Sequence, residues 1–113
     1  MRKLLVPALL AVVLATALAV PAFSARKNIE VDDDYFVRRG APPTVKVTRN
    51  DKVVWEWEGS NPHNVTVTRG PVKFASRTKT SGTYAKRLRS RGTYKIGCTL
   101  HRLAGMRMTL KVR

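Results

Sequence analysis

Short segments in which apolar and polar residues alternate are the feature that most constrains the fold of this chain. Residues 44–48 alternate strictly, and residues 53–57 follow them after the turn pair Asn50-Asp51. Alternation with a period of two is typical of strands that bury one face, and valine, threonine and tryptophan favour strands. Beyond residue 25 almost nothing has the spacing of an amphipathic helix, so we expect an all-β fold.

Further runs of the same kind extend to the C-terminus. Residues 64–68 and 107–112 place apolar side chains on one face. Residues 84–88 and 93–96 are joined by a short polar segment that contains glycine, which predicts a hairpin. About seven short strands separated by turns predict a β-sandwich that forms one domain. Residues 74–81 are polar and fit either a loop or a single helical turn.

The N-terminus has the pattern of a secretory signal peptide. A basic tip is followed by 17 uncharged residues, 4–20, and then by the small residues Ala22 and Ser24. These two suit the positions three and one before a cleavage site. We therefore expect a helical signal segment over residues 1–24, a mature domain over residues 25–113, and export to the periplasm or the extracellular face. The alternative is an uncleaved N-terminal membrane anchor, because 17 residues is at the short end of a spanning helix.

The net charge of +15 is unevenly placed along the chain. All seven acidic residues lie before Gly59, where residues 25–58 carry equal numbers of acidic and basic groups. Residues 59–113 carry thirteen basic groups and no acidic group. Such a field favours association with an acidic surface, and the few aromatic residues of the basic half argue against nucleic acid as the partner. A catalytic set that needs a carboxylate cannot be assembled from residues 59–113, so we do not expect an enzyme.

The only cysteine and both histidines fall into one pattern with a methionine. Cys98, His101 and Met106 form a C-x2-H-x4-M cluster, and His63 lies upstream of it. One thiolate, two imidazoles and a thioether are the ligand set of a mononuclear blue-copper site. A single cysteine excludes a disulfide framework, a CxxC pair and a Cys2His2 zinc site. Met108 is a rival to Met106, and zinc is a weaker alternative metal because a thioether adds little for it.

Two stretches resemble a known family. NPHNVTV (residues 61–67) and GTYKIGCTLHRLAGM (residues 92–106) are similar to the two copper motifs of the plastocyanin, pseudoazurin and halocyanin group of cupredoxins. The resemblance covers nearly all of residues 30–113, and it implies a Greek-key β-sandwich with one type 1 copper ion at one end. It also implies the ligand roles. His63, Cys98 and His101 would be the strong equatorial ligands, and Met106 the weak axial one.

The same resemblance implies roles for residues around the ligands. Asn64 matches the family's asparagine, which joins the two ligand-bearing segments by hydrogen bonds. His101 would pass the electron through an apolar patch on the surface. The candidates for this patch are Pro62, Leu100, Leu103 and Ala104.

The chain also departs from the family pattern at two positions. Leu100 stands where proline is common, and Gly97 stands before the cysteine where a bulky aromatic residue is common. We expect the first change to loosen the ligand loop and the second to thin the packing near the thiolate.

We therefore expect a monomeric protein that shuttles single electrons between a donor and an acceptor redox protein with acidic docking surfaces. No stable membrane insertion is expected once the signal is cleaved. Two alternatives stay open: a secreted copper-binding protein for storage or delivery, and a basic β-sandwich that binds an anionic surface. Methionine-rich or histidine-rich tracts would favour storage, and the sequence contains none. The basic residues expected to steer a partner are Lys86, Arg87, Arg89 and Arg91 around the predicted hairpin, with Arg102 and Arg107 beside the ligands.

Overall fold

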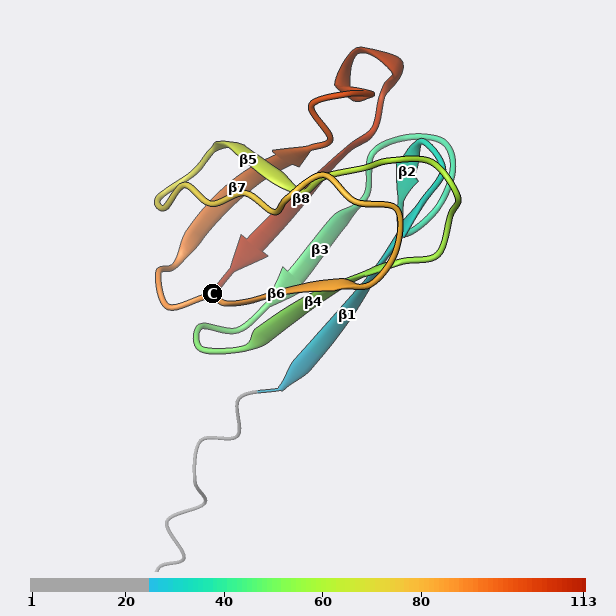
Figure 1. Ribbon diagram of the computed structural model, residues 1–113. Helices are drawn as coiled ribbons and strands as arrows, with labels where there is room; N and C mark the ends of the chain where they lie inside the picture. Colours follow the sequence, from blue (N-terminus) through green and yellow to red (C-terminus); the bar gives the residue numbers. More distant parts are fainter. Residues whose placement is uncertain (1–24) are drawn as a thin grey trace, which may run out of the picture.

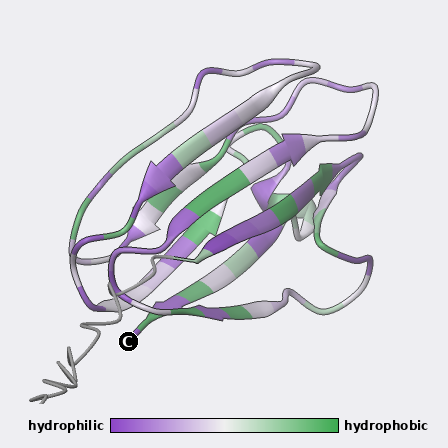
Figure 2. Cartoon of the chain, turned by 90° about the horizontal axis from the view of Figure 1, so that it is seen from below, coloured by the Kyte–Doolittle hydropathy of each residue, from purple (hydrophilic) through white to green (hydrophobic). Residues whose placement is uncertain are grey.

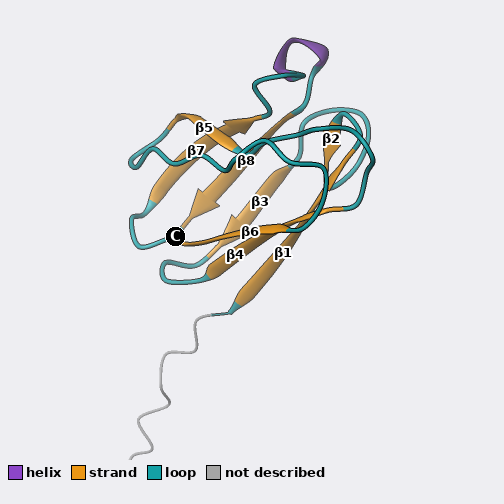
Figure 3. Ribbon diagram, viewed as in Figure 1, coloured by secondary structure: helices purple, strands orange, loops and turns teal. Residues whose placement is uncertain are grey.

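The structure is a computed structural model that describes residues 25–113, so the predicted signal segment 1–24 lies outside the described residues. The strands are β1 (Arg26–Asp32), β2 (Tyr35–Phe36), β3 (Thr44–Val47), β4 (Lys52–Trp57), β5 (Thr66–Arg69), β6 (Thr83–Arg87), β7 (Gly92–Gly97) and β8 (Arg107–Val112). Within residues 25–113 the one helical element is the three-residue 3-10 helix η1 (Arg102–Ala104) (Figure 3). The predicted all-β class is confirmed. In this part of the chain no helix has the length and apolar character needed to cross a membrane.

The strands form two four-stranded sheets that pack face to face as a sandwich (Figure 1). One sheet has the order β2-β1-β4-β6, and the other has the order β3-β8-β7-β5. β1 runs parallel to β4 and β3 runs parallel to β8, whereas the remaining pairs are antiparallel. The predicted β-sandwich is therefore confirmed, with eight strands rather than about seven. β1 and β2 lie outside the runs named from the sequence, and β2 has only two residues, which is too short to show alternation.

The core lies between the two sheets and follows from the alternation. Along β8, Met108, Leu110 and Val112 are buried while the residues between them are exposed or half-buried. Figure 2 shows the same alternation of hydrophobic and hydrophilic residues along the strands. Trp55 of β4 and Tyr94 of β7 are the largest fully buried side chains. Burying a large aliphatic or aromatic side chain contributes about 1.5–3 kcal/mol, and this core stabilises a chain whose single cysteine forms no disulfide.

The predicted hairpin between residues 84–88 and 93–96 is wrong. β6 pairs with β4, and β7 pairs with β5 and β8, so the connection between β6 and β7 crosses from one sheet to the other. Leu88 is buried in the core, and its backbone bonds to Asn50 and Asp51 rather than to β7. A short polar segment with a glycine serves a hairpin and a corner between sheets equally well. Local sequence therefore did not distinguish them.

Residues 74–81 form a loop, which is the first of the two predicted alternatives, and contain no helical turn. They run extended beside the segment that contains His63, with isolated bridges between Thr66 and Ala75 and between His63 and Lys79. Lys79 exchanges both backbone hydrogen bonds with His63, at 3.0 Å each. This polar segment therefore holds the backbone of His63 in place, outside the regular strand β5.

Candidate metal centre

The loop between β7 and β8 lies at the end of the sandwich opposite the connection from β6 to β7 (Figure 1). Its backbone closes on itself, because the N–H of His101 donates to the carbonyl of Cys98 at 3.2 Å and the N–H of Met106 donates to the carbonyl of His101 at 3.2 Å. Gly105 ends η1 with φ of +95°, the left-handed conformation that glycine adopts without strain. The loop thus returns into β8 directly after presenting Cys98 and His101.

Three predicted metal-binding side chains converge at this end. His63, Cys98 and His101 each offer one ligand atom, and these atoms all lie within 4.8 Å of one another. The Nδ1 atoms of the two histidines are 3.2 Å apart, and Cys98 Sγ is 3.6 Å from His101 Nδ1. His63 and Cys98 are fully buried, whereas the His101 side chain is 28% exposed. The cluster therefore has a buried interior and one ligand that reaches the surface.

A carboxylate lies beside the Nε2 atom of each histidine, and the Nδ1 atoms of the two rings face each other. His63 Nε2 lies 3.0 Å from Asp33 Oδ1, and His101 Nε2 lies 3.5 Å from Asp34 Oδ1. An ionised carboxylate only accepts hydrogen bonds, so the His63 Nε2 that bonds to Asp33 carries a hydrogen and the Nδ1 of His63 faces the cluster as a lone-pair donor. The Nδ1 atom of His101 and the sulfur of Cys98 face the same point as the Nδ1 atom of His63, so three metal-binding atoms are directed at one another. Two imidazoles and a thiolate fit a type 1 copper site.

Asp33 is held firmly in its position beside His63. Its carboxylate accepts the backbone N–H groups of Asn61 at 2.9 Å and Ser60 at 3.0 Å. The Asn61 N–H, the His63 imidazole and the Ser60 N–H together lower the pKa of Asp33 to about 2. Gly59 makes this approach possible, because a Cβ at that position would lie 2.3 Å from Asp33 Oδ1. The carboxylate beside His63 therefore stays ionised at neutral pH.

The sequence prediction missed Asp33 and Asp34. They lie about thirty residues before His63, in a run of three aspartates that follows the buried part of β1. The parallel register of β1 and β4 pairs Val31 with Trp57, which brings Asp33 beside Gly59 two residues further along. The run of aspartates at a strand end was the visible signal, but only the pairing of β1 with β4 connects it to the histidine.

Asn64 joins the two ligand-bearing segments. Its side-chain NH2 donates to Thr99 Oγ1 at 2.8 Å and to Thr78 Oγ1 at 3.0 Å. Its carbonyl oxygen accepts the backbone N–H of Thr99 at 3.1 Å. Thr99 directly follows Cys98, so Asn64 fixes the position of His63 relative to the cysteine. Asn64 is itself buried, which protects these hydrogen bonds from water.

The two methionines occupy different places. Met106 is fully buried, and its carbonyl accepts the N–H of Cys98 at 3.2 Å, so its backbone is bonded to the ligand loop. Met108 is also buried, but it lies within β8 opposite Ile96 of β7. Met106 therefore belongs to the ligand loop and Met108 to the strand, while the axial role of Met106 stays a prediction.

The predicted patch residues are all exposed, as a docking patch requires. Leu103 is 94% exposed and Leu100 is 56% exposed, and Pro62 and Ala104 are exposed as well. The space next to Gly97 is not empty. A Cβ there would lie 3.3 Å from Cγ of Arg102, so the alkyl stem of Arg102 covers the position where thinner packing was expected.

Comparisons with known proteins agree with this geometry. Residues 27–113 match the profile of the family described as copper binding proteins, plastocyanin/azurin family. The fold is similar to the Cu(I) form of a methionine-to-alanine mutant of amicyanin, with 24% identity over 84% of this chain and 88% of that one and a TM-score of 0.65. It is also similar to a purple cupredoxin from Nitrosopumilus maritimus, with 17% identity over 77% of this chain and 99% of that one and a TM-score of 0.64.

A further solved structure with this fold is a copper-containing nitrite reductase from Thermus scotoductus SA-01. The two chains are 14% identical over 78% of this chain and 22% of the reductase, with a TM-score of 0.63. No curated protein matches the sequence.

Proposed function

This chain belongs to the plastocyanin/azurin family of copper-binding proteins, and on that premise we propose that it carries single electrons between redox proteins outside the cytoplasm. One observation carries the proposal: two imidazole Nδ1 atoms and a cysteine sulfur converge within 4.8 Å in a largely buried site. A copper ion bound there would take up and release one electron by alternating between Cu(I) and Cu(II).

The protein's own contribution is to keep the ligand atoms in fixed positions. Asp33 holds the hydrogen of His63 on Nε2, which leaves Nδ1 free to bind the metal. Asn64 ties the His63 segment to Thr99, and Cys98 is bonded through its backbone to Met106. Ligands that are held in this way do not need to move when the charge of the metal changes. Met106 belongs to the ligand loop and would supply a weaker fourth ligand through its thioether.

The exposed edge of His101 is the route by which the electron leaves the site. It is the only one of the three clustered ligands that reaches solvent in residues 25–113. The apolar patch of Pro62, Leu100, Leu103 and Ala104 provides a surface that a partner can cover without leaving charged groups buried and unpaired. A redox partner that docks on this patch would therefore approach the site closely.

A carrier is favoured over an enzyme and over a storage protein. The fold also occurs in a nitrite reductase, of which this chain spans 22%. Residues 25–113 hold a single cluster of three metal-binding side chains, however, and its ligands are mostly buried. Storage or delivery needs a site that opens to release its metal, whereas His63 and Cys98 lie fully buried behind hydrogen-bonded segments. Export follows from the predicted signal peptide, and N-terminal sequencing of the exported protein should begin at Ala25.

The test is to add Cu(II) to the purified protein and to record its absorption, electron paramagnetic resonance and voltammetry. We expect one copper per chain, an intense blue band from thiolate-to-copper charge transfer, and a reversible one-electron wave. Cys98→Ser should stay folded by circular dichroism and lose the blue band. A wild-type protein that is colourless with bound copper under oxidising conditions would contradict the electron-transfer role and favour storage.

A further inference from the structure

We propose that the outer face of the β3-β8-β7-β5 sheet is the docking surface for an acidic face of the redox partner, an inference that rests on the proposed electron-transfer function. The outward positions of these strands carry cations and threonines. The cations are Lys46, Arg69, Lys95, Arg107 and Lys111, all of them exposed. The four strands contain no acidic residue. In the part of the chain that the structure describes, none of these five cations forms an ion pair with a carboxylate.

The strand register places like charges directly opposite each other on this sheet. Lys46 of β3 pairs with Lys111 of β8, and Arg69 of β5 pairs with Lys95 of β7. Directly opposite side chains lie within interaction distance, and like charges in such pairs destabilise a sheet. Two pairs of this kind on one face therefore carry an unfavourable electrostatic energy in the isolated protein. A carboxylate-rich partner would remove that repulsion when it binds.

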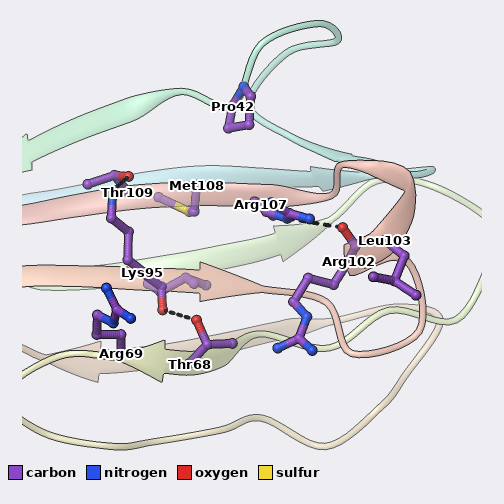
Figure 4. Close-up of a pocket in the computed structure, with 10 residues that line it drawn as sticks. Pro42, Thr68, Arg69, Lys95, Arg102, Leu103, Arg107, Met108 and Thr109 are labelled. Carbon is purple, nitrogen blue, oxygen red and sulfur yellow. Dashed lines mark hydrogen bonds between the residues drawn. The ribbon is translucent and has the colours of Figure 1, made fainter.

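A groove at the ligand end of this face can receive a side chain of the partner (Figure 4). Its volume is about 640 Å³, and four cations line it together with the exposed Leu103. The four cations are Arg69, Lys95, Arg102 and Arg107. Arg107 Nε donates to the carbonyl of Arg102 at 3.1 Å, and the stem of Arg102 packs over Gly97. Lys95 Nζ donates to Thr109 Oγ1 at 3.0 Å, so three of the four cations are held in place before a partner arrives.

The position of the groove connects the docking face to the metal centre. Arg102 and Leu103 belong to the loop that carries Cys98 and His101, so a partner seated in the groove lies beside that loop. The basic cluster around residues 86–91 does not share this position. Arg91 and Cys98 lie at opposite ends of β7, which has six residues. At ~3.3 Å per residue the strand is about 20 Å long. The cations expected to steer a partner thus divide into a set near the site and a set at the far end.

The character of the face favours a protein over nucleic acid or lipid as the occupant. The exposed and half-buried positions of these four strands hold no aromatic side chain on which bases could stack. Within the groove the cations surround a hollow that suits a carboxylate side chain projecting from a folded surface. An acidic protein face therefore complements both the charge and the shape.

The test compares Arg69→Glu with Arg91→Glu, which makes the same change in net charge at the far end of the sandwich. The first probe is poly-L-glutamate, measured at ionic strengths of about 0.01 M and 0.15 M, where charges are screened over ~30 Å and ~8 Å. The second probe is the rate of electron transfer to a c-type cytochrome of net negative charge. We expect Arg69→Glu to lower both affinity and rate by about tenfold or more at low salt, and Arg91→Glu to lower them less than threefold.

Arg69→Glu also creates an opposite-charge pair with Lys95, so its midpoint of urea unfolding should rise while docking weakens. A merely structural role for Arg69 would not move stability and docking in opposite directions. Equal losses in both variants would show that only net charge matters and would overturn the docking face. The wild-type protein is also tested with phosphatidylglycerol vesicles and with single-stranded DNA. If it bound either of these more tightly than the acidic probes, and Arg69→Glu lost that binding, the proposal of a protein partner would be wrong. Copper content and blue colour are recorded for every variant, so a failed metal site is distinguished from failed docking.

Discussion

The β2-β1-β4-β6 sheet and its connections hold all seven acidic residues of the chain, whereas the strands of the β3-β8-β7-β5 sheet hold cations and no acid. Several of these acidic groups have internal partners. Asp33 binds His63, Asp51 accepts two backbone N–H groups, and Glu56 lies 3.9 Å from Arg26. The cations of the second sheet face one another instead. These acids therefore serve the fold and the metal centre, while the cations of the β3-β8-β7-β5 sheet remain available to a partner.

Removing Asp33, the carboxylate that the connection between β1 and β2 places beside the metal centre, should give the largest effect. We expect Asp33→Ala to lower copper affinity by about 10–100-fold, because the group that orients a metal-binding histidine is lost. The reduction potential should rise, because a nearby negative charge favours Cu(II) over Cu(I). Competition with a chelator and voltammetry measure the two effects.

Asp33→Asn is the matched variant, since it keeps an oxygen acceptor but removes the charge. Its potential should rise with a smaller loss of affinity. The pKa of Asp33 is held at about 2, so its charge is constant between about pH 5 and 8 and its effect should not vary over that range. Wild-type affinity and potential in Asp33→Ala would show that this carboxylate does not serve the metal centre.

The next effect separates stability from metal binding. Asp51 is buried at the opposite end of β4 and accepts the N–H groups of Ala25 at 2.9 Å and Thr48 at 2.8 Å. We expect Asp51→Ala to lower the free energy of unfolding by about 1–3 kcal/mol, since it leaves these donors without their partner. Urea unfolding measures the change, and Asp51→Asn should recover part of it. Copper affinity should stay at the wild-type value, and a large loss of affinity would contradict the division of roles among the acids.

The next effect distinguishes the ligand loop, which contains Met106, from strand β8, which contains Met108. Met106→Leu should keep the blue colour and shift the reduction potential, because a weak axial ligand tunes the metal rather than holding it. Met108→Leu should change the free energy of unfolding by about 1.5 kcal/mol or less, as volume-conserving swaps usually do. If Met108 rather than Met106 controlled the potential, the assignment of the axial ligand would be wrong.

The smallest effect tests the like-charge pairs themselves. We expect Lys46→Thr to raise the free energy of unfolding by about 0.2–1 kcal/mol, because it removes the repulsion from Lys111 across the strands. Lys111→Thr should give a similar gain, and the double variant should gain little more, since both remove one interaction. About 1 M salt should shrink the difference. Fully additive gains at low salt would show that the two lysines do not interact.

The sequence predicted the class of fold and the metal-binding cluster because both depend on local or compositional information. Alternation reveals a strand and its buried face, and a chain with one cysteine and two histidines offers few choices of ligand. Strand partners could not be predicted in the same way. The segment around Leu88 crosses between sheets although it has the composition of a hairpin turn. Turn residues specify that the chain bends, but they do not specify which strand the next segment pairs with. The role of Asp33 was not predicted because it depends on the pairing of β1 with β4.

The position of β8 has a consequence for the order in which the molecule assembles. β8 follows all the other strands in the sequence, yet it lies between β3 and β7 in its sheet. β3 cannot join that sheet until β8 (residues 107–112) has been synthesised and has paired with it. This pairing closes a loop of about sixty residues. Pairing over such sequence separations slows folding. We therefore expect the parallel pair β1 and β4 to form early and the metal pocket to close in the last step of folding.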